Sequence, residues 1–497
     1  MVQHKLGETL PLLHKYNVEK GLHFTKTNNF GARHVQALLM FFGVCFSYFL
    51  RVNISAAIVP MTQFNAGYAS YEYWDSRIKS LILSSFFWGY VLAQVPASML
   101  ARRFGGKIIL GGATAVSAVI TVFHPLAVVK GDWQLLCFLR VLVGLMQGVV
   151  YPCLHTLLAR WVPHSERGFL CTFVYSGAQL GTAILLVISG SIFNSNMRWP
   201  GIFYISGSIA LLWSLIFLLF GCDSPRNSNN ISKAERNYIE ASTGATEQSE
   251  DVDVPWRSIF TSVPFFALIA AHCGFTWGFY TLLTEVPTYL NSALNLDMKS
   301  NALLSALPYF VMWILCLILS PIADLLIRRH ITSVTVSRKL FNSIGQWIPM
   351  MCLIALSYIN QTAITLSVVL LTVAIGFNAA SFCGYLVNHM DLSPNFAGPL
   401  MGITNGISNL LSIFAPLVAG VVIHNEEDPE EWRKVFLITA TVYFLCNLLF
   451  VVFGKASVQP WNYKLRNVAS TSTNNGSTLT SISTIAYENN LTSSTPG

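Results

Sequence analysis

Twelve separate stretches of this sequence are apolar for about 19 residues or more, and polar or charged segments separate them. They lie at 35–59, 78–100, 108–128, 134–158, 169–193, 200–221, 263–288, 301–327, 341–359, 362–388, 397–423 and 433–454. An α-helix needs about 20 residues to cross the roughly 30 Å hydrocarbon core of a bilayer, so each stretch can form one span. The sequence therefore predicts an all-α membrane protein with twelve transmembrane helices.

Few charged residues accompany this apolar content. Only 11% of the 497 residues are charged and 53% are hydrophobic, whereas about 25% of the residues of a soluble domain are charged. This composition excludes soluble, disordered and collagen-like classes. Nearly all of the ten cysteines fall inside or beside apolar stretches, so no disulfide framework is indicated. The net charge of +7 is mild and no basic stripe is present, so we expect no nucleic-acid partner.

Lys and Arg are distributed unevenly between the segments that connect the apolar stretches. Of the 30 Lys and Arg, 21 lie in the two tails and in the connections on the same side, and 7 lie on the other side. Cytoplasmic segments next to membrane helices carry an excess of these residues. The sequence therefore predicts a multi-pass protein of the lipid bilayer with both tails in the cytoplasm.

The chain divides into two halves of six apolar stretches each. A polar, partly acidic segment at 222–257 separates residues 35–221 from residues 258–454. The halves have nearly equal lengths, which is typical of the repeated bundles of transporters. We therefore expect an N-terminal and a C-terminal six-helix bundle, a cytoplasmic linker between them, and a cytoplasmic N-terminal tail at 1–34. Residues 467–497 are rich in Ser, Thr and Asn, and we expect 455–497 to form a disordered cytoplasmic tail.

Polar side chains recur at helical spacing in the first, fourth, seventh and tenth stretches. They are Ser47, Arg51 and Ser55, then Arg140, Gln147, Tyr151 and His155, then His272, Thr276, Tyr280, Thr284 and Glu285, and finally Asn378, Ser381, Tyr385 and Asn388. A polar side chain in lipid is costly, so these residues should face other protein or a water-filled path. The first helix of every three is the set expected to line the central path of a transporter with triplet repeats. The small members, Ser and Thr, are also common packing residues between membrane helices.

Arg51 is the most informative member of these stripes. It lies about eight residues from the outer end of its stretch, which is too deep for its side chain to reach the interface. It therefore needs an anion or a carboxylate partner, and we expect a substrate anion, with Glu285 as the competing partner. The neutral donors expected around that anion are Tyr151, His155, Tyr280, Tyr385 and Asn388.

Arg140 and His155 are each open to two interpretations. Arg140 lies near the start of its stretch, where a gating or structural role at the membrane edge competes with substrate contact. The imidazole of His155 can exchange protons near neutral pH, but a histidine in a membrane helix is often only a hydrogen-bonded packing residue. The sequence alone leaves these alternatives open.

A series of motifs adds a family resemblance to this interpretation. The motifs are Arg51-Val52-Asn53, SFFWGYVLAQVP at 85–96, RRFGGK at 102–107, RVLVGLMQGVVYPCLH at 140–155, YSGAQLG at 175–181, WGFYTLLTEVPTYL at 277–290, FNSIG at 341–345 and LVNHMDLSPNFAG at 386–398. In this order they resemble the anion:cation symporters of the major facilitator superfamily, which include sialin, the vesicular glutamate transporters and the type I sodium/phosphate cotransporters. The resemblance covers about 33–463, and it is strongest to the insect branch named for inorganic phosphate cotransport. It implies the major facilitator fold of two six-helix bundles.

Two positions, Gln147 and Arg102, differ from the family pattern, and a third, Asp324, agrees with it. Sialin and the vesicular glutamate transporters have a glutamate at the position of Gln147, and a neutral amide cannot carry a proton, which favours Na⁺ over H⁺. Arg102 replaces the acidic residue that the superfamily has after its second helix, whereas Asp324 keeps the counterpart in the second half. The resemblance assigns Gln147 and Asp324 to coupling or gating, and Arg140 and Glu285 are candidates for the same role.

The expected function is therefore secondary active transport. Sodium-dependent symport of inorganic phosphate by alternating access is favoured, and the alternative is proton-coupled export of acidic sugars or other organic anions from lysosomes or vesicles. The cotransported cation is Na⁺ or H⁺, and no resident cofactor or metal is expected. An enzyme is disfavoured because the sequence lacks H-E-x-x-H, G-x-S-x-G and a Walker-type phosphate loop.

The N-terminal tail contains a candidate sorting signal. Glu8, Leu12 and Leu13 match the acidic dileucine pattern, and two leucines in a polar segment could enter an apolar pocket of a clathrin adaptor. A working signal would place the protein in an endosomal or lysosomal membrane. The alternative is a plasma-membrane protein in which so short a pattern occurs by chance.

Overall fold

The computed structural model describes residues 30–62, 74, 76–193, 195–228, 230–243, 254–290, 298–359, 363–423 and 428–463. These residues form helices and connections, and no strand occurs among them. The proposed sorting residues Glu8, Leu12 and Leu13 lie outside the described part of the chain, as do residues 464–497.

The first half of the chain forms one bundle of long helices. Its helices are α2 (Ala32–Thr62), α3 (Ser76–Phe104), α4 (Gly106–Val122), α5 (His124–Gln147), α6 (Val150–Trp161), α7 (Arg167–Phe193) and α8 (Arg198–Phe220). Helix α5 is broken at Gly131 and Asp132, whose backbone angles are not helical, so the chain turns there between two spans. Helix α4 and the start of α5 thus form the third span, and the rest of α5 with α6 forms the fourth.

The second half forms a similar bundle in which two spans are interrupted. Its helices are α11 (Val263–Thr288), α12 (Met298–Arg328), α13 (Val334–Ser357), α14 (Ile364–Phe377), the π-helix η5 (Phe382–Leu386), α15 (Val387–Leu392), α16 (Ala397–Ser412), α17 (Phe414–Val422) and α18 (Pro429–Phe453). Helix α18 has a well-defined start, because Asp428 accepts a hydrogen bond from the amide of Glu430 (2.9 Å) and Pro429 supplies the fixed φ of a first helical residue.

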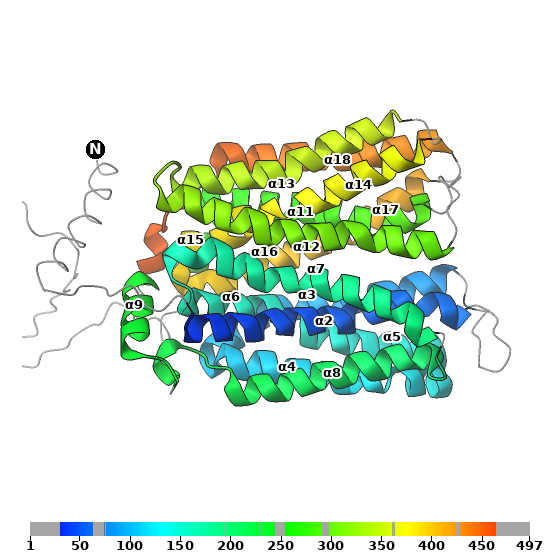
Figure 1. Cartoon of the computed structure of the whole chain (residues 1–497), viewed down its shortest axis with the longest axis horizontal. Helices are drawn as coiled ribbons and strands as arrows, with labels where there is room; N and C mark the ends of the chain where they lie inside the picture. The colour runs from blue at the N-terminus through cyan, green and yellow to red at the C-terminus, as the bar shows by residue number, and fades with distance from the viewer. Residues whose placement is uncertain are drawn as a thin grey trace, which may run out of the picture.

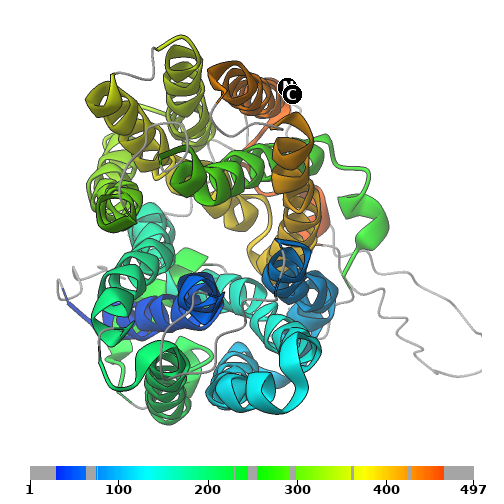
Figure 2. The same cartoon turned by 90° about the vertical axis from the view of Figure 1, so that its right-hand side faces the viewer.

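The helix count agrees with twelve spans. Ten helical segments of the described residues are long and apolar enough to cross a membrane, and some of these join two neighbouring helices. The short apolar α4 and the pair α16 and α17 supply the other two spans. Figure 1 shows α2 to α8 in one half of the molecule and α11 to α18 in the other, with their long axes roughly parallel. Viewed from the end, the two bundles lie one above the other (Figure 2).

The connection between the bundles contains a helix that is attached to the first bundle. Helix α9 (Lys233–Thr243) carries Glu235, which accepts a hydrogen bond from Arg33 (2.9 Å) at the start of α2. Arg33 also binds Glu166 (2.7 Å), in the connection between α6 and α7. The start of α2, the helix α9 and the last described residues all lie at one end of the molecule, which we call the tail end (Figure 1).

The start of the C-terminal tail differs from the disordered segment that the sequence predicts. Residues Pro460–Tyr463 form a short 3-10 helix, η7. The side-chain oxygen of Asn462 accepts hydrogen bonds from the hydroxyl of Ser393 (2.6 Å) and the amide of Asn395 (3.2 Å). The prediction was wrong for residues 455–463 because the buried ring of Trp461 gives this polar segment an apolar anchor against Phe396.

Candidate functional site

Arg51 on α2 lies among aromatic rings from three helices. Its guanidinium carbon is 4.8 to 5.7 Å from the ring centres of Tyr90, Phe86, Phe87, Tyr48 and Tyr280. The guanidinium also donates a hydrogen bond to the Tyr280 hydroxyl on α11, in the other bundle. The rings attract a cation through their negative faces but carry no charge of their own. Arg51, which is half-buried, therefore keeps a net positive charge where the two bundles meet.

A second arginine shares one of these rings. The guanidinium carbon of Arg140 on α5 is 5.1 Å from the ring centre of Phe86, and that of Arg51 is 4.9 Å from the same centre. The Arg140 side chain is buried, and its Nε and one terminal nitrogen have no hydrogen-bond partner. Two positive groups thus lie beside one phenylalanine.

Glu285, the carboxylate expected as an alternative partner of Arg51, does not pair with it. Within the described residues, the contacts of Arg51 are aromatic rings and the Tyr280 hydroxyl, and Glu285, half-buried and further along α11, is not among them. A cation without a counter-ion is unfavourable away from water, and most so for the buried Arg140, because its desolvation is not offset. The pair Arg51 and Arg140 is therefore suited to bind an anion from solution.

A chain of hydrogen bonds continues from this pair into the second bundle. The Tyr280 hydroxyl donates to the side chain of Asn409 on α16 (3.4 Å), and Asn409 donates to the side-chain oxygen of Asn405 (2.9 Å). Asn405 in turn donates to the Tyr90 hydroxyl (2.9 Å) and to Gln94 (3.0 Å) on α3. The sequence analysis did not identify the residues of α3 and α16, although Asn405, Asn409 and Ser412 recur at helical spacing on α16.

Tyr151 links the arginine region to the histidine next along α6. Its hydroxyl is 3.2 Å from the hydroxyl of Tyr48, and its ring stacks on that of Tyr175 with centres 5.7 Å apart. The Tyr175 hydroxyl is 2.6 Å from Nδ1 of His155. Tyr151 and His155 were predicted to flank the same anion. In the structure Tyr151 lies next to Tyr48, and His155 lies one helical turn further along α6, where Tyr175 contacts both residues.

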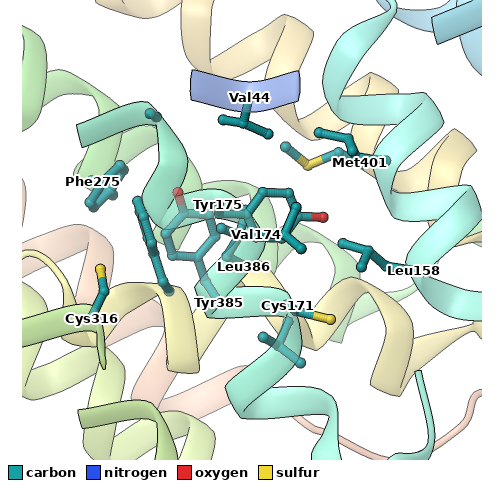
Figure 3. Close-up of a cluster of buried hydrophobic side chains, with 14 of the residues drawn as sticks. Val44, Leu158, Cys171, Val174, Tyr175, Phe275, Cys316, Tyr385, Leu386 and Met401 are labelled. Atoms are coloured by element: carbon teal, nitrogen blue, oxygen red, sulfur yellow. The ribbon is translucent and has the colours of Figure 1, made fainter. Parts of the chain in front are cut away.

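Tyr385, Asn388 and Gln147 are buried at other points of the interior. Tyr385 packs against His272 (centres 4.8 Å apart) and Phe275 (5.4 Å), in a buried cluster that also contains Tyr175 and Leu386 (Figure 3). Asn388 is completely buried, and neither its side-chain oxygen nor its nitrogen has a hydrogen-bond partner. The nitrogen of Gln147 is likewise without a partner. Among the described residues, none of these three side chains forms a hydrogen bond or a ring contact with Arg51.

Three buried histidines from three helices meet at the boundary between the bundles. The ring centre of His389 on α15 is 5.2 Å from that of His155 and 6.0 Å from that of His272 on α11. The hydroxyl oxygen of Thr404 on α16 lies 2.7 Å from Nε2 of His389 and 3.1 Å from Nδ1 of His272. All three imidazoles are at most 3% exposed. We call His155, His272 and His389 the histidine array.

Asp324 joins the two bundles at the tail end rather than at the central site. Its carboxylate, at the end of α12, accepts a hydrogen bond from the amide of Phe169 (2.7 Å) in the first turn of α7. The partial positive charge of a helix N-terminus favours a carboxylate at this place. A side chain at Gly168 would overlap the carboxylate, so the close approach requires glycine. Asp324 therefore connects α12 of the second bundle to α7 of the first.

A second tail-end contact is formed by a carboxylate between two arginines. Asp391 at the end of α15 accepts a hydrogen bond from Arg338 on α13 (2.7 Å) and lies 3.5 Å from Arg167 at the start of α7. Arg167 also donates to the carbonyl of Met390 (3.3 Å). With α12 packed on α7 and α16 packed on α3 and α6, these contacts close the tail end.

The arrangement of two bundles around a central charged site can be compared with known proteins. The sequence profile of the Major Facilitator Superfamily matches residues 40–416. The chain belongs to this superfamily. It is 36% identical over 488 residues to a Drosophila melanogaster protein named "Putative inorganic phosphate cotransporter", covering 93% of this chain and 92% of the relative. It is 35% identical to human sialin, over 86% of this chain and 90% of sialin.

A solved structure with the same fold is that of the proton:xylose symporter XylE bound to 6-bromo-6-deoxy-D-glucose. The TM-score is 0.68, and the match covers 85% of this chain and 96% of XylE at 16% identity. The fold is thus the all-helical major facilitator fold, and the chain is a multi-pass membrane transporter of the anion:cation symporter group, not an enzyme. Within the described residues no group of three or more His, Cys, Asp or Glu side chains could hold a metal ion.

Proposed function

We propose that this transporter carries inorganic phosphate together with a cation, by alternating access to a site at Arg51. The observation that supports this most directly is the pair of guanidiniums beside Phe86 with no carboxylate among the described contacts of Arg51. Arginine forms two parallel hydrogen bonds to phosphate or carboxylate oxygens, so either class of anion fits the charge. The relative from Drosophila melanogaster named for phosphate cotransport favours phosphate.

The site residues take distinct roles in this proposal. Arg51 is the primary anion ligand, Arg140 adds the second positive charge, and Tyr280 turns its hydroxyl from Arg51 to the bound anion. Tyr151, Tyr385 and Asn388 are the further neutral side chains that donate hydrogen bonds to the anion when the bundles move. Because Tyr280 belongs to the second bundle and Arg51 to the first, an anion between them would attract both bundles to itself.

Transport requires the tail-end contacts to open and close. Asp324 bound to the start of α7, and Asp391 bound to Arg167, hold the bundles together on that side. Rocking of the bundles about the central site would break these contacts and expose the anion to the tail side. A cation must accompany the anion on inward movement, because each negative charge moved against a negative-inside potential costs about 2.3 kcal/mol per 100 mV.

Phosphate uptake by purified protein in liposomes tests this function. We expect saturable uptake of radiolabelled phosphate into liposomes, abolished by Arg51→Ala and largely lost in Arg51→Lys, because an ammonium cannot supply the two parallel hydrogen bonds. Arg226→Ala is the matched control, since Arg226 forms an exposed pair with Glu240 in the connection between the bundles and should leave uptake unchanged.

Competition identifies the anion in the same assay. Phosphate, sialic acid, glucuronate, glutamate and urate are offered at equal concentration against labelled phosphate. Inhibition by sialic acid or glucuronate at a much lower concentration than by unlabelled phosphate would replace the phosphate assignment by the sialin-like alternative. Normal uptake by Arg51→Ala would contradict the proposed anion site itself.

A further inference from the structure

We infer that the coupled cation is a proton and that the histidine array carries it, an inference that rests on the proposed symport function. The array joins both bundles, with His155 on the first and His272 and His389 on the second. Imidazole is the side chain that gains and loses a proton near neutral pH. The array also offers nitrogen atoms, whereas Na⁺, like other hard cations, prefers oxygen ligands.

The hydrogen bonds between His272 and His389 define a direction for proton movement. Nδ1 of His389 lies 3.0 Å from the carbonyl of Leu386, which can only accept, so this nitrogen carries hydrogen. In neutral His389 the other nitrogen, Nε2, must then accept from the Thr404 hydroxyl (2.7 Å). The Thr404 oxygen is left to accept from Nδ1 of His272 (3.1 Å). A chain of hydrogen bonds thus runs from His272 through Thr404 to His389, and it uses a shorter contact of the Thr404 hydroxyl than the one to the Met401 carbonyl (3.4 Å).

This chain can transfer one proton without leaving a charge behind. A proton that binds Nε2 of His272 allows the proton on Nδ1 to move to the Thr404 oxygen, while the Thr404 hydroxyl proton moves to Nε2 of His389. His272 is then neutral again, Thr404 has regained its hydroxyl, and His389 has become an imidazolium. The positive charge has crossed from α11 to α15.

His155 has surroundings that accept the protonated form. Its Nε2 lies 3.2 Å from the carbonyl of Leu386, and its Nδ1 lies 3.2 Å from the carbonyl of Tyr151 and 2.6 Å from the Tyr175 hydroxyl. A group that can only accept thus faces each ring nitrogen, which suits an imidazolium with two N–H donors. The Leu386 carbonyl faces both His155 and His389, so it connects the two bundles through their histidines.

The π-helix explains how one carbonyl reaches two histidines. Leu386 is the last residue of η5, and the backbone at Gly384 is not helical (φ −87°, ψ −106°). A side chain at Gly384 would collide with Asn342 on α13, so the kink depends on glycine. Single π-helical turns inside membrane helices are frequent at functional sites.

Few other charged or titratable groups face the array. The tyrosines around it lie on α6, α7 and η5, and they are Tyr151, Tyr175 and Tyr385. Helix α7 also presents Cys171, whose sulfur is 3.9 Å from that of Met390. The charged pair Arg167 and Asp391 lies next to the array, but Asp391 is bound to Arg338. No carboxylate among the described residues contacts the three imidazoles, so the mobile proton is not held by a permanent counter-ion.

Opening of the tail end would change the array directly. The contact between Nε2 of His155 and the Leu386 carbonyl joins α6 of one bundle to η5 of the other. Separation of the bundles on the tail side breaks it and exposes the array to water there. A proton bound in the closed state can therefore leave to the tail side together with the anion from Arg51, which couples the two movements.

Three measurements on purified protein in liposomes test this inference. The first is phosphate–phosphate exchange without any gradient, the second is uptake driven by a proton gradient without Na⁺, and the third is uptake driven by a Na⁺ gradient at equal pH. Wild type should perform exchange and proton-driven uptake. His272→Gln and His389→Gln should retain exchange within about twofold but lose proton-driven uptake about tenfold or more, because the proton relay is removed.

Thr404 separates a relay from a purely structural role. Thr404→Val keeps the shape but removes the hydroxyl, so it should reduce proton-driven uptake and spare exchange, and Thr404→Ser should restore the uptake. The matched control is His124→Gln, because His124 is also buried in a membrane helix but stacks on Phe203 away from the array. Retained exchange shows that each variant is folded. All variants are compared at one pH because phosphate itself titrates.

The two proposals fail in different ways. Exchange together with uptake driven by Na⁺ and not by protons would overturn the histidine inference and leave the transport function intact. Proton-driven uptake at the wild-type rate in both His272→Gln and Thr404→Val would also overturn it. Absence of exchange and of all uptake in wild type would instead contradict the proposed function.

Discussion

Single residues of the central site differ in how well the sequence predicts them. Arg51 was identifiable because a charge so deep in an apolar stretch is costly, and the structure places it between the bundles. The rings of Tyr48, Phe86 and Phe87 were not, since aromatic residues are common in membrane helices and their chemistry alone gives no sign of a bound cation. Tyr48 lies one turn before Arg51 on α2, and the packing of α3 against α2 and α5 brings Phe86 and Phe87 to the guanidinium.

Phe86 is the residue on which the electrostatics of the site depends most. Phe86→Leu keeps an apolar side chain but removes the ring shared by Arg51 and Arg140. Each cation–π contact stabilises the pair by about 0.5–2 kcal/mol, so the two guanidiniums should lose their relative position. We expect the KM for phosphate to rise about three- to tenfold, measured as initial uptake rates. Phe41→Leu, which removes a buried ring stacked on Phe173, should leave KM unchanged, and an equal rise in both variants would contradict the specific role of Phe86.

At the scale of helices, hydropathy predicts where spans lie but not where they break. The predicted stretch 169–193 agrees with α7 (Arg167–Phe193) because nothing interrupts its apolar sequence. The predicted stretch 362–388 is also continuous in hydropathy, yet the structure divides it into α14, η5 and α15. The division follows from the close approach of Gly384 to α13, a tertiary contact that no local pattern records.

The contact between Asp324 and the start of α7 should control opening of the tail end. Gly168→Ala places a methyl group against the Asp324 carboxylate, and Asp324→Asn removes the charge that the helix N-terminus attracts. A carboxylate at a helix N-terminus contributes up to about 2 kcal/mol, so either change should shift the population towards the open form by roughly tenfold. We expect faster alkylation of the buried Cys171 on α7, measured by peptide mass spectrometry.

Gly112→Ala is the matched control for this experiment. A side chain at position 112 meets no atom within 4 Å, so the variant adds a methyl group to a membrane helix without disturbing a contact. Its Cys171 should react at the wild-type rate. Unchanged alkylation in both Gly168→Ala and Asp324→Asn would show that the contact does not hold the tail end closed.

At the scale of the whole molecule, the relation between the bundles carries most of what the sequence could not predict. His155 and His272 were recognisable as members of polar stripes on the fourth and seventh spans. Their connection through His389 and Thr404 depends on how α16 packs between α11 and the first bundle. Such a contact joins residues 132 positions apart in the chain, and the motifs of one sequence do not specify it.

Location decides the direction in which the whole molecule works, because a lysosomal transporter would export anions to the cytoplasm and one at the plasma membrane would import them. Glu8, Leu12 and Leu13 lie ahead of α2 and outside the described residues, in a polar segment that an adaptor protein could bind through an apolar pocket for the leucines. We expect Leu12→Ala/Leu13→Ala to raise the surface fraction of the tagged protein several-fold, measured by surface biotinylation. Lys5→Ala, a change in the same tail outside the pattern, should leave that fraction unchanged. A surface fraction that is high in wild type and equal in the double variant would remove the sorting role and leave import across the plasma membrane as the direction of transport.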